Sequence, residues 1–122
     1  MRTNKPITVF VGDDNRATDV MEIGGLYVYG APTLRIALAQ TIFSLPDAIV
    51  IDASEANLQL ADETYAHLGT IQHPPLVVLS DEPNRWDTSN MNTVTILPAN
   101  AAPSEIAAAV GHSIRKQLEP AC

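Results

Sequence analysis

The sequence predicts an α/β protein: a three-layer, doubly wound arrangement in which helices cover both faces of a parallel five-stranded sheet. Five short apolar runs alternate with segments of helical spacing, and each run is closed by Gly, Pro, Asp or Ser. Three of the runs are nearly continuous in apolar residues, which is typical of parallel strands covered on both faces. Right-handed crossovers then favour the strand order 2-1-3-4-5.

The expected strands are these five apolar runs. They comprise residues 7–12 (ITVFVG), 26–30 (LYVYG), 48–52 (AIVID), 75–80 (PLVVLS) and 93–97 (TVTIL). Tyr27 and Tyr29 alternate along the second run, which suits a strand at the edge of the sheet.

Residues 103–118 carry the clearest helical pattern. Pro103 suits the first turn, and an apolar residue recurs at every fourth position. The members of this stripe are Ile106, Val110, Ile114 and Leu118. Gly111 costs about 1 kcal/mol relative to Ala inside a helix, so we expect it to lie close to the sheet.

Residues 32–45 and 57–68 predict two further helices. Pro32 suits the opening turn of the first, and Gly69 follows the second. One face of the 32–45 helix carries Leu34, Ala37, Leu38, Thr41, Ile42 and Leu45. We expect this apolar face to be buried against the sheet.

The sequences of two connecting segments predict weaker helices. Residues 15–23 are the only helical segment between the first two strands, before Gly24 and Gly25 end it, so this first helix is expected to be shortened. The segment 81–92 is polar and has few helix formers, so the fourth helix is expected to be weak.

Length and composition indicate one domain, residues 1–122, with a core of about 6–118. The single cysteine, Cys122, excludes an intrachain disulfide and favours a reducing, cytoplasmic setting. No apolar stretch reaches the roughly 18 to 20 residues that a membrane-spanning helix needs, so no membrane association is expected.

The chain is acidic, with a formal charge of −7 and a pI near 4.6. Only seven basic residues are present and they are scattered, which argues against nucleic acid as a partner. The acidity suits a divalent cation or a basic protein surface, and it also suits a solvated exterior with no binding role.

Acidic side chains follow the strands at the edge where ligands bind in open α/β sheets. Asp13 and Asp14 follow the first strand, Asp52 ends the third, and Ser80 ends the fourth. Two unit charges about 4 Å apart repel by roughly 4 kcal/mol at an effective dielectric of 20, and a divalent cation removes that repulsion. The candidate metal ligands for Mg²⁺ are Asp13, Asp14 and Asp52. Each acid alone also suits a structural role as a helix cap or turn former.

This pattern resembles the receiver domain of bacterial response regulators, which has a flavodoxin-like fold. The resemblance spans nearly the whole chain, and "PDAIVID" (46–52) is its most specific part. It implies that Asp13 and Asp14 hold the metal, that Asp52 is the phosphoacceptor, and that the Ser80 hydroxyl binds the transferred phosphoryl group. It also implies a non-enzymatic module of two-component phosphorelay signalling, with a histidine kinase or another protein as partner.

The sequence departs from the receiver pattern at several positions. Receivers carry a lysine just after the fifth strand, whereas this stretch reads "ILPANAAP", and neither Lys5 nor Lys116 can replace it. The Met-Pro and glycine loop after the phosphoacceptor and the aromatic residue of strand five are also missing. Arg85 is a candidate anion contact in place of the lysine. Trp86 is expected to pack over the sheet, with an interface anchor as the alternative.

Receivers use about four turns in their first helix, whereas two at most are expected here. We therefore expect under-covered apolar sheet surface beside this helix and, from it, a homodimer.

Three functions remain open from the sequence. The first is an atypical receiver, or pseudo-receiver, that acts mainly through protein-protein interaction and has an incomplete phosphorylation switch. The second is a functional Mg²⁺-dependent receiver with Asp52 as phosphoacceptor. The third is a flavodoxin-like domain that binds a small ligand, although the acidic loop "GDDNRATD" suits a bound phosphate poorly.

Overall fold

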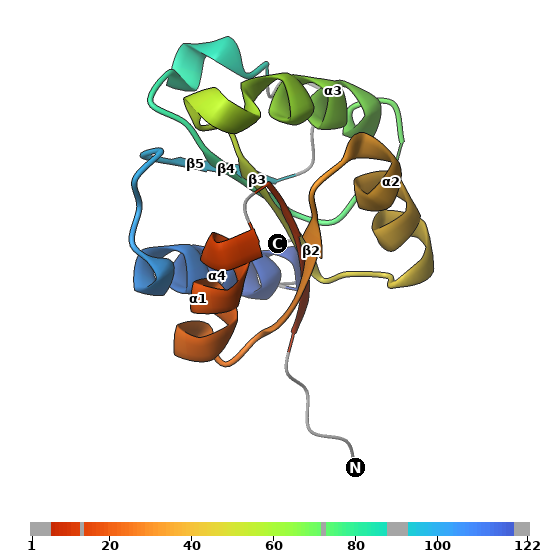
Figure 1. The fold of residues 1–122 in the computed structure, drawn as a ribbon. Helices are drawn as coiled ribbons and strands as arrows, with labels where there is room; N and C mark the ends of the chain where they lie inside the picture. Colours follow the sequence, from red (N-terminus) through yellow and green to blue (C-terminus); the bar gives the residue numbers. More distant parts are fainter. Residues whose placement is uncertain (1–5, 13, 72, 88–92, 119–122) are drawn as a thin grey trace.

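A five-stranded parallel sheet forms the middle layer of the molecule (Figure 1). The computed structural model describes residues 6–12, 14–71, 73–87 and 93–118. The strands are β1 (Ile7–Val11), β2 (Tyr27–Ala31), β3 (Ala48–Asp52), β4 (Leu76–Leu79) and β5 (Val94–Leu97). All five predicted strands are therefore confirmed, with ends that differ by at most one residue.

The strands follow the predicted order, β2-β1-β3-β4-β5, and every neighbouring pair is parallel. β1 lies between β2 and β3, so the winding of the chain reverses at β1. Val11 pairs with Ile51, which brings the carboxyl ends of β1 and β3 side by side. In sheets of this kind, that position is where a site is built from the loops.

The helices are α1 (Asp14–Gly24), α2 (Leu34–Phe43), α3 (Leu58–Leu68) and α4 (Pro103–Leu118). Figure 1 shows α1 and α4 on one face of the sheet and α2 and α3 on the other. Two 3-10 turns, η1 (Glu55–Asn57) and η2 (Pro83–Arg85), precede α3 and follow β4. Within the described ranges, no helix is both long enough and apolar enough to cross a membrane.

Each face of the sheet buries its own apolar cluster. Successive side chains of a strand point to opposite faces, so Val9 lies in the cluster beneath α2 and α3, and Phe10 lies in the one beneath α1 and α4. Full burial of a side chain such as Phe10 contributes about 1.5–3 kcal/mol. Because β1, β3 and β4 are covered on both faces, their sequences are continuously apolar rather than alternating.

Helix α1 is longer than predicted. It spans 11 residues, about three turns, because it begins at Asp14 and includes Gly24 as its last residue. Ala17 and Val20 of α1 are buried in the same cluster as Phe10. The helix thus covers its face of the sheet, and the homodimer prediction loses the support that a two-turn helix would have given it.

The fourth connection follows the prediction of a weak helix. Residues 81–87 contain only the short turn η2, and residues 88–92 lie outside the described ranges.

Helix α2 differs from the prediction at both ends. Thr33 is its N-cap, with the Thr33 Oγ1 atom accepting a hydrogen bond from the Ile36 N–H at 3.2 Å, so Pro32 lies outside the helix. Ala37 is buried as expected, but Ile42 and Leu45 are 62% and 77% exposed. The prediction failed because α2 carries apolar residues on both of its faces, so its sequence does not show which one meets the sheet.

Two glycines near the α1–α4 contact have opposite surroundings. A Cβ atom on Gly24 would lie 2.4 Å from the Ala107 Cβ of α4, so this glycine permits the two helices to approach closely. A Cβ on Gly111 would meet only the Arg115 Nη1 at 3.3 Å. The expectation that Gly111 touches the sheet is therefore wrong, and Gly24 is the residue that close packing requires.

We predict opposite effects of the same substitution at these two positions. Gly24→Ala should destabilise the fold by about 1–3 kcal/mol, because the added methyl group forces α1 away from α4. Gly111→Ala should stabilise it by up to about 1 kcal/mol, because Ala is the better helix former and the Arg115 side chain can move. Urea unfolding followed by Trp86 fluorescence measures both, and a stabilised Gly24→Ala variant would contradict the close α1–α4 contact.

Candidate functional site

Asp52 is the last residue of β3, and its side chain is buried beneath the loops, with 2% of the residue exposed. The Asp52 Oδ1 atom accepts a hydrogen bond from the backbone N–H of Ser54 at 3.0 Å. Burying an ionised carboxylate is strongly unfavourable unless it is paired and hydrogen-bonded. The end of β3 therefore requires a positive charge nearby.

Arg16, in the first turn of α1, supplies this charge. Its Nη1 atom lies 3.5 Å from Asp52 Oδ1, and its Nη2 atom donates a hydrogen bond to the carbonyl oxygen of Ala101 at 2.8 Å. At such a separation the Coulomb attraction is about 4 kcal/mol at an effective dielectric of 20, before the cost of desolvation. Ala101 lies between β5 and α4, so one guanidinium links β3, α1 and the β5–α4 loop.

Gly12, directly after β1, allows Asp52 to occupy its position. The Gly12 φ angle is +139°, and a Cβ atom there would lie 2.7 Å from the Asp52 Cβ. Any other residue would meet both a strained backbone and a steric clash. The N–H of Gly12 donates to the Ala31 carbonyl oxygen at 3.2 Å, which fixes the turn beside β2.

Ser80 lies at the carboxyl end of β4, as predicted, and is buried. Asp52 pairs with Leu79 in the β3–β4 register, and the Ala53 N–H donates to the Leu79 carbonyl oxygen at 3.0 Å. The structure thus places Asp52 and Ser80 on neighbouring strands at the same edge. The Ser80 Oγ accepts a hydrogen bond from the Glu82 N–H at 3.1 Å, so its hydroxyl organises the following turn.

Two of the three predicted metal ligands are not part of the described site. Asp13 lies outside the described residues, and Asp14 begins α1 with a side chain that is likewise outside them. The residues that are described contain no group of three His, Cys, Asp or Glu side chains placed to hold a metal. At the end of β3 the described residues supply one carboxylate, that of Asp52, and its Oδ1 already faces a guanidinium. By themselves they do not fit a divalent cation, and the Mg²⁺ site remains a prediction.

The stretch after β5 carries no positive charge at the site. The strand ends at Leu97, and Pro98 follows it directly. Asp81 Oδ1 accepts a hydrogen bond from the Ala99 N–H at 3.0 Å, so an acidic side chain holds this loop against the end of β4. The cation that contacts the loop is Arg16, which comes from the opposite end of the sequence.

Sequence reasoning missed Arg16. One signal was available: Arg16 is among only seven Lys and Arg residues, and it follows the acidic pair by two positions. What the sequence did not contain is the direction of α1, which decides whether this side chain reaches Asp52 or solvent.

A pocket of about 370 Å³ opens beside Ser80. Its lining includes three acidic residues, Glu55, Asp81 and Glu82. A negatively charged lining disfavours an anionic ligand in the absence of a cation.

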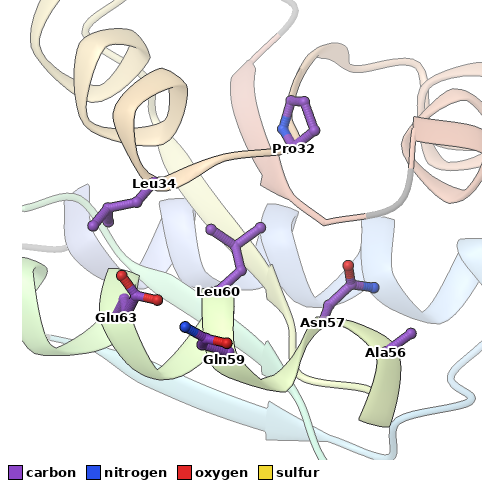
Figure 2. A pocket seen from close by; sticks show the side chains of 7 residues that line it. All are labelled: Pro32, Leu34, Ala56, Asn57, Gln59, Leu60 and Glu63. Atoms are coloured by element: carbon purple, nitrogen blue, oxygen red, sulfur yellow. The ribbon is translucent and has the colours of Figure 1, made fainter.

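A second pocket, of about 340 Å³, lies between the start of α2 and the start of α3 (Figure 2). Leu34 and Leu60 give it an apolar part, and Asn57, Gln59 and Glu63 add polar groups from the α3 side. Neither Asp52 nor Ser80 lines it. This second pocket is therefore separate from the strand-end site.

Trp86 packs over the sheet, which confirms the first of its two predicted roles. It is buried in the cluster beneath α2 and α3, and its ring meets Tyr65 edge-on at a centroid distance of 5.0 Å. Arg85 beside it pairs with Asp62 through two contacts, at 2.6 and 3.2 Å. Because the Asp62 carboxylate hydrogen-bonds to this guanidinium, the pKa of Arg85 is raised. Arg85 thus binds α3 and does not face Asp52, contrary to its candidate role as an anion contact.

Comparisons with known proteins bear on the fold. A scan against protein-family models gave no match, and a search of curated proteins gave none either. A response regulator receiver domain from Clostridium thermocellum aligns with a TM-score of 0.71 and 15% identity, covering 93% of this chain and 97% of its own. The pseudo-receiver domain of CikA aligns with a TM-score of 0.65 and 19% identity, covering 97% of this chain and 100% of its own.

The anti-anti-sigma factor PhyR from Bartonella quintana also aligns, with a TM-score of 0.69 and 14% identity over 95% of this chain. The matched region is 50% of PhyR, so this chain spans half the length of that protein. Together these likenesses show that the chain has the fold of receiver and pseudo-receiver domains. The resemblance predicted from the sequence is confirmed at this level.

We predict that a double-mutant cycle will show that Arg16 and Asp52 are coupled in their effect on stability. Arg16→Met should destabilise the fold by about 2–4 kcal/mol, because it leaves a buried carboxylate without a counter-charge. Asp52→Asn should destabilise the wild type but stabilise the Arg16→Met variant, because it removes the orphaned charge.

The measurement is urea unfolding in the presence of EDTA, so that no divalent cation replaces the guanidinium. Arg85→Met is the matched control, since the Arg85–Asp62 pair is more exposed and should contribute much less to stability than the Arg16–Asp52 pair. If Asp52→Asn has the same effect in both backgrounds, the two side chains are not coupled.

A second prediction concerns alkaline pH. Burial, and then the charge of Asp87, raise the pKa of the Tyr65 phenol above its usual 10.0, and the Tyr65 hydroxyl donates to the Asp87 carbonyl oxygen at 2.7 Å. The folded state holds this proton more tightly than the unfolded state. The resulting stabilisation is complete below pH 10 and is lost as the pH rises through the folded-state pKa. Unfolding free energies of the wild type should therefore fall more steeply above pH 10 than those of Tyr65→Phe.

Proposed function

We propose that this chain is a receiver-like signalling domain that acts mainly through contact with other proteins, and that its phosphorylation switch is incomplete. The observation that carries this proposal is the environment of Asp52. The resemblance to receivers assigns the phosphoacceptor role to this residue at the end of β3, and the Arg16 guanidinium of the same polypeptide lies 3.5 Å from its Oδ1.

The Arg16 guanidinium supports an incomplete switch in two ways. It provides at Asp52 Oδ1 the positive charge that a divalent cation would provide, so an anionic phosphoryl donor and a metal ion would both have to displace it. It also binds the Ala101 carbonyl, and so occupies the loop from which receivers extend their lysine. Arg16 thus stabilises the unmodified form of the site.

The proposed output is a protein-protein interaction rather than catalysis. The described strand-end site contains a neutralised carboxylate and a hydroxyl that is engaged with its own turn. The neighbouring pocket is acidic, which also disfavours the third function that the sequence left open, binding of a flavodoxin-type anionic cofactor. A protein of a two-component pathway, such as a histidine kinase, is the proposed class of partner.

One observation favours a second function, a working Mg²⁺-dependent phosphoacceptor. Asp52 ends β3 and Ser80 directly follows the paired strand β4, so both lie at the carboxyl edge of the sheet, as phosphoryl transfer to Asp52 would require. In that reaction an Asp52 carboxylate oxygen attacks the phosphorus of an acyl phosphate, forming an aspartyl phosphate and releasing the carboxylate of the donor. Asp13, Asp14 and Asp52 are the residues that would hold the metal.

The two functions predict different results with acetyl phosphate and Mg²⁺. For the incomplete switch, intact-mass spectrometry should show no more phosphoryl incorporation in the wild type than in Asp52→Asn. Addition of Mg²⁺ and beryllofluoride should leave Trp86 fluorescence unchanged, because the Arg16–Asp52 pair persists. A receiver domain known to accept phosphate from acetyl phosphate serves as the positive control.

Modification of the wild type that Asp52→Asn abolishes would establish the second function instead. The Arg16→Met variant adds a further comparison. If Arg16 is what blocks the site, this variant should bind Mg²⁺ more tightly than the wild type, as measured by calorimetry.

A further inference from the structure

The charges of this chain are distributed very unevenly. The protein has 14 acidic residues, yet none lies between Glu22 and Asp47, and this segment of 24 residues carries a single base, Arg35. One Arg and no acid give the segment a net charge of +1, in a chain whose formal charge is −7. The segment contains β2 and α2, which lie at one edge of the molecule.

The same segment carries most of the exposed apolar side chains. Of nine large apolar residues that are exposed in the described part of the chain, seven lie between residues 23 and 45. Phe43, at the end of α2, is 83% exposed, and Ile42 beside it is 62% exposed. Ile36, Ile42 and Phe43 belong to one helix, α2, and exposed apolar side chains gathered on one helix favour an interaction site there.

The outer face of α2 is a regular stripe. With 3.6 residues per turn, Arg35, the half-buried Ala39 and Ile42 lie opposite the buried Ala37, and Ile36 and Phe43 flank them on one side. The inner face packs on β1, β2 and α3. A helix that is apolar on all sides is normally buried on all sides, and the described residues leave the outer side of α2 exposed.

We propose that this outer face of α2 binds the same face of a second copy, with the two helices antiparallel across a two-fold axis near Ala39. The stripe is self-complementary in this arrangement. Ala39 is small and permits close approach at the centre, and Ile36 of each copy faces the Ile42 and Phe43 end of the other.

The position of Arg35 supports the antiparallel direction. Arg35 lies in the first turn of α2, where the helix dipole is positive and a cation is unfavourable. In an antiparallel pair it would lie beside the carbonyl end of the partner's α2, where a cation is favourable. The charge of Arg35 in one copy and the helix dipole of α2 in the other therefore favour an antiparallel pair of identical helices.

The charge distribution also favours a second copy of the chain, rather than an anionic membrane or a nucleic acid, as the partner of this face. Two copies with a charge of −7 repel each other, and the acid-free segment adds no negative charge of its own to a shared interface, with Glu63 of α3 as the acid beside the start of α2. An anionic membrane or a nucleic acid attracts clusters of Lys and Arg, and this face has one arginine. The proposal does not depend on the state of Asp52.

Analytical ultracentrifugation over a range of concentrations tests the interface. The wild type should form dimers, and Phe43→Glu should raise the dimer dissociation constant roughly tenfold or more, because the dimer buries the new charge twice. Ile71→Glu is the matched control, since Ile71 is 47% exposed outside the segment and should dimerise like the wild type. A wild type that stays monomeric up to about 1 mM, or equal effects of both variants, would overturn the proposal.

Crosslinking tests the two-fold axis directly. In a Cys122→Ser background, an Ala39→Cys variant should form a covalent dimer with a short bismaleimide reagent, whereas Ile71→Cys should not. Preferential crosslinking through Ile71→Cys would place the contact elsewhere. Retention by anionic vesicles or by nucleic acid, with no dimer, would also refute self-association. Circular dichroism and Trp86 fluorescence of each variant confirm that the fold is retained.

Discussion

The rest of the strand-end site depends on the buried negative charge of Asp52. A carboxylate placed at the end of a fully covered strand requires a cation, hydrogen-bond donors and space, and the chain provides each from a different element. Arg16 of α1 supplies the cation, the Ser54 N–H donates a hydrogen bond, and Gly12 supplies the space. Because Arg16 also binds the Ala101 carbonyl, the same charge fixes the β5–α4 loop relative to α1. The buried charge of Asp52 therefore constrains the relative positions of β3, α1 and the β5–α4 loop.

The packing of α1 against α4 follows from the same arrangement. Arg16 reaches both Asp52 and Ala101 from the first turn of α1, and the close approach of Gly24 to Ala107 holds the last turn of α1 against α4. Helix α1 is thus fixed at both ends, by an ion pair at one and by steric fit at the other. The two contacts of Arg16 use different nitrogens, Nη1 for Asp52 and Nη2 for the Ala101 carbonyl.

The sequence was sufficient to predict the layers, the strand order and the placement of Asp52 and Ser80 at strand ends, because strand burial and crossover handedness are local and general rules. It was not sufficient for Arg16, since the reach of a long side chain depends on how its helix is oriented in three dimensions. It also failed for Ile42, because a helix with apolar residues on two faces does not indicate which face meets the sheet. It failed for Leu45 because α2 ends at Phe43, and Leu45 lies beyond it with a positive φ of 49°. Asp13 and Asp14 remain predictions, as their side chains are not among those described.

The two proposals concern opposite faces of one sheet. The Arg16–Asp52 pair involves α1 and the β5–α4 loop. The proposed dimer contact is the outer face of α2, a helix whose inner face packs on β1, β2 and α3. Two routes connect Asp52 to α2: the close-packed strands, which deform little, and the Ser54 N–H, η1 and α3, since α3 packs on α2. We expect self-association through α2 to be constitutive, because neither Asp52 nor Arg16 lies on α2. A receiver fold used in this way is a scaffold, in which assembly on one face leaves the other face free to bind a partner.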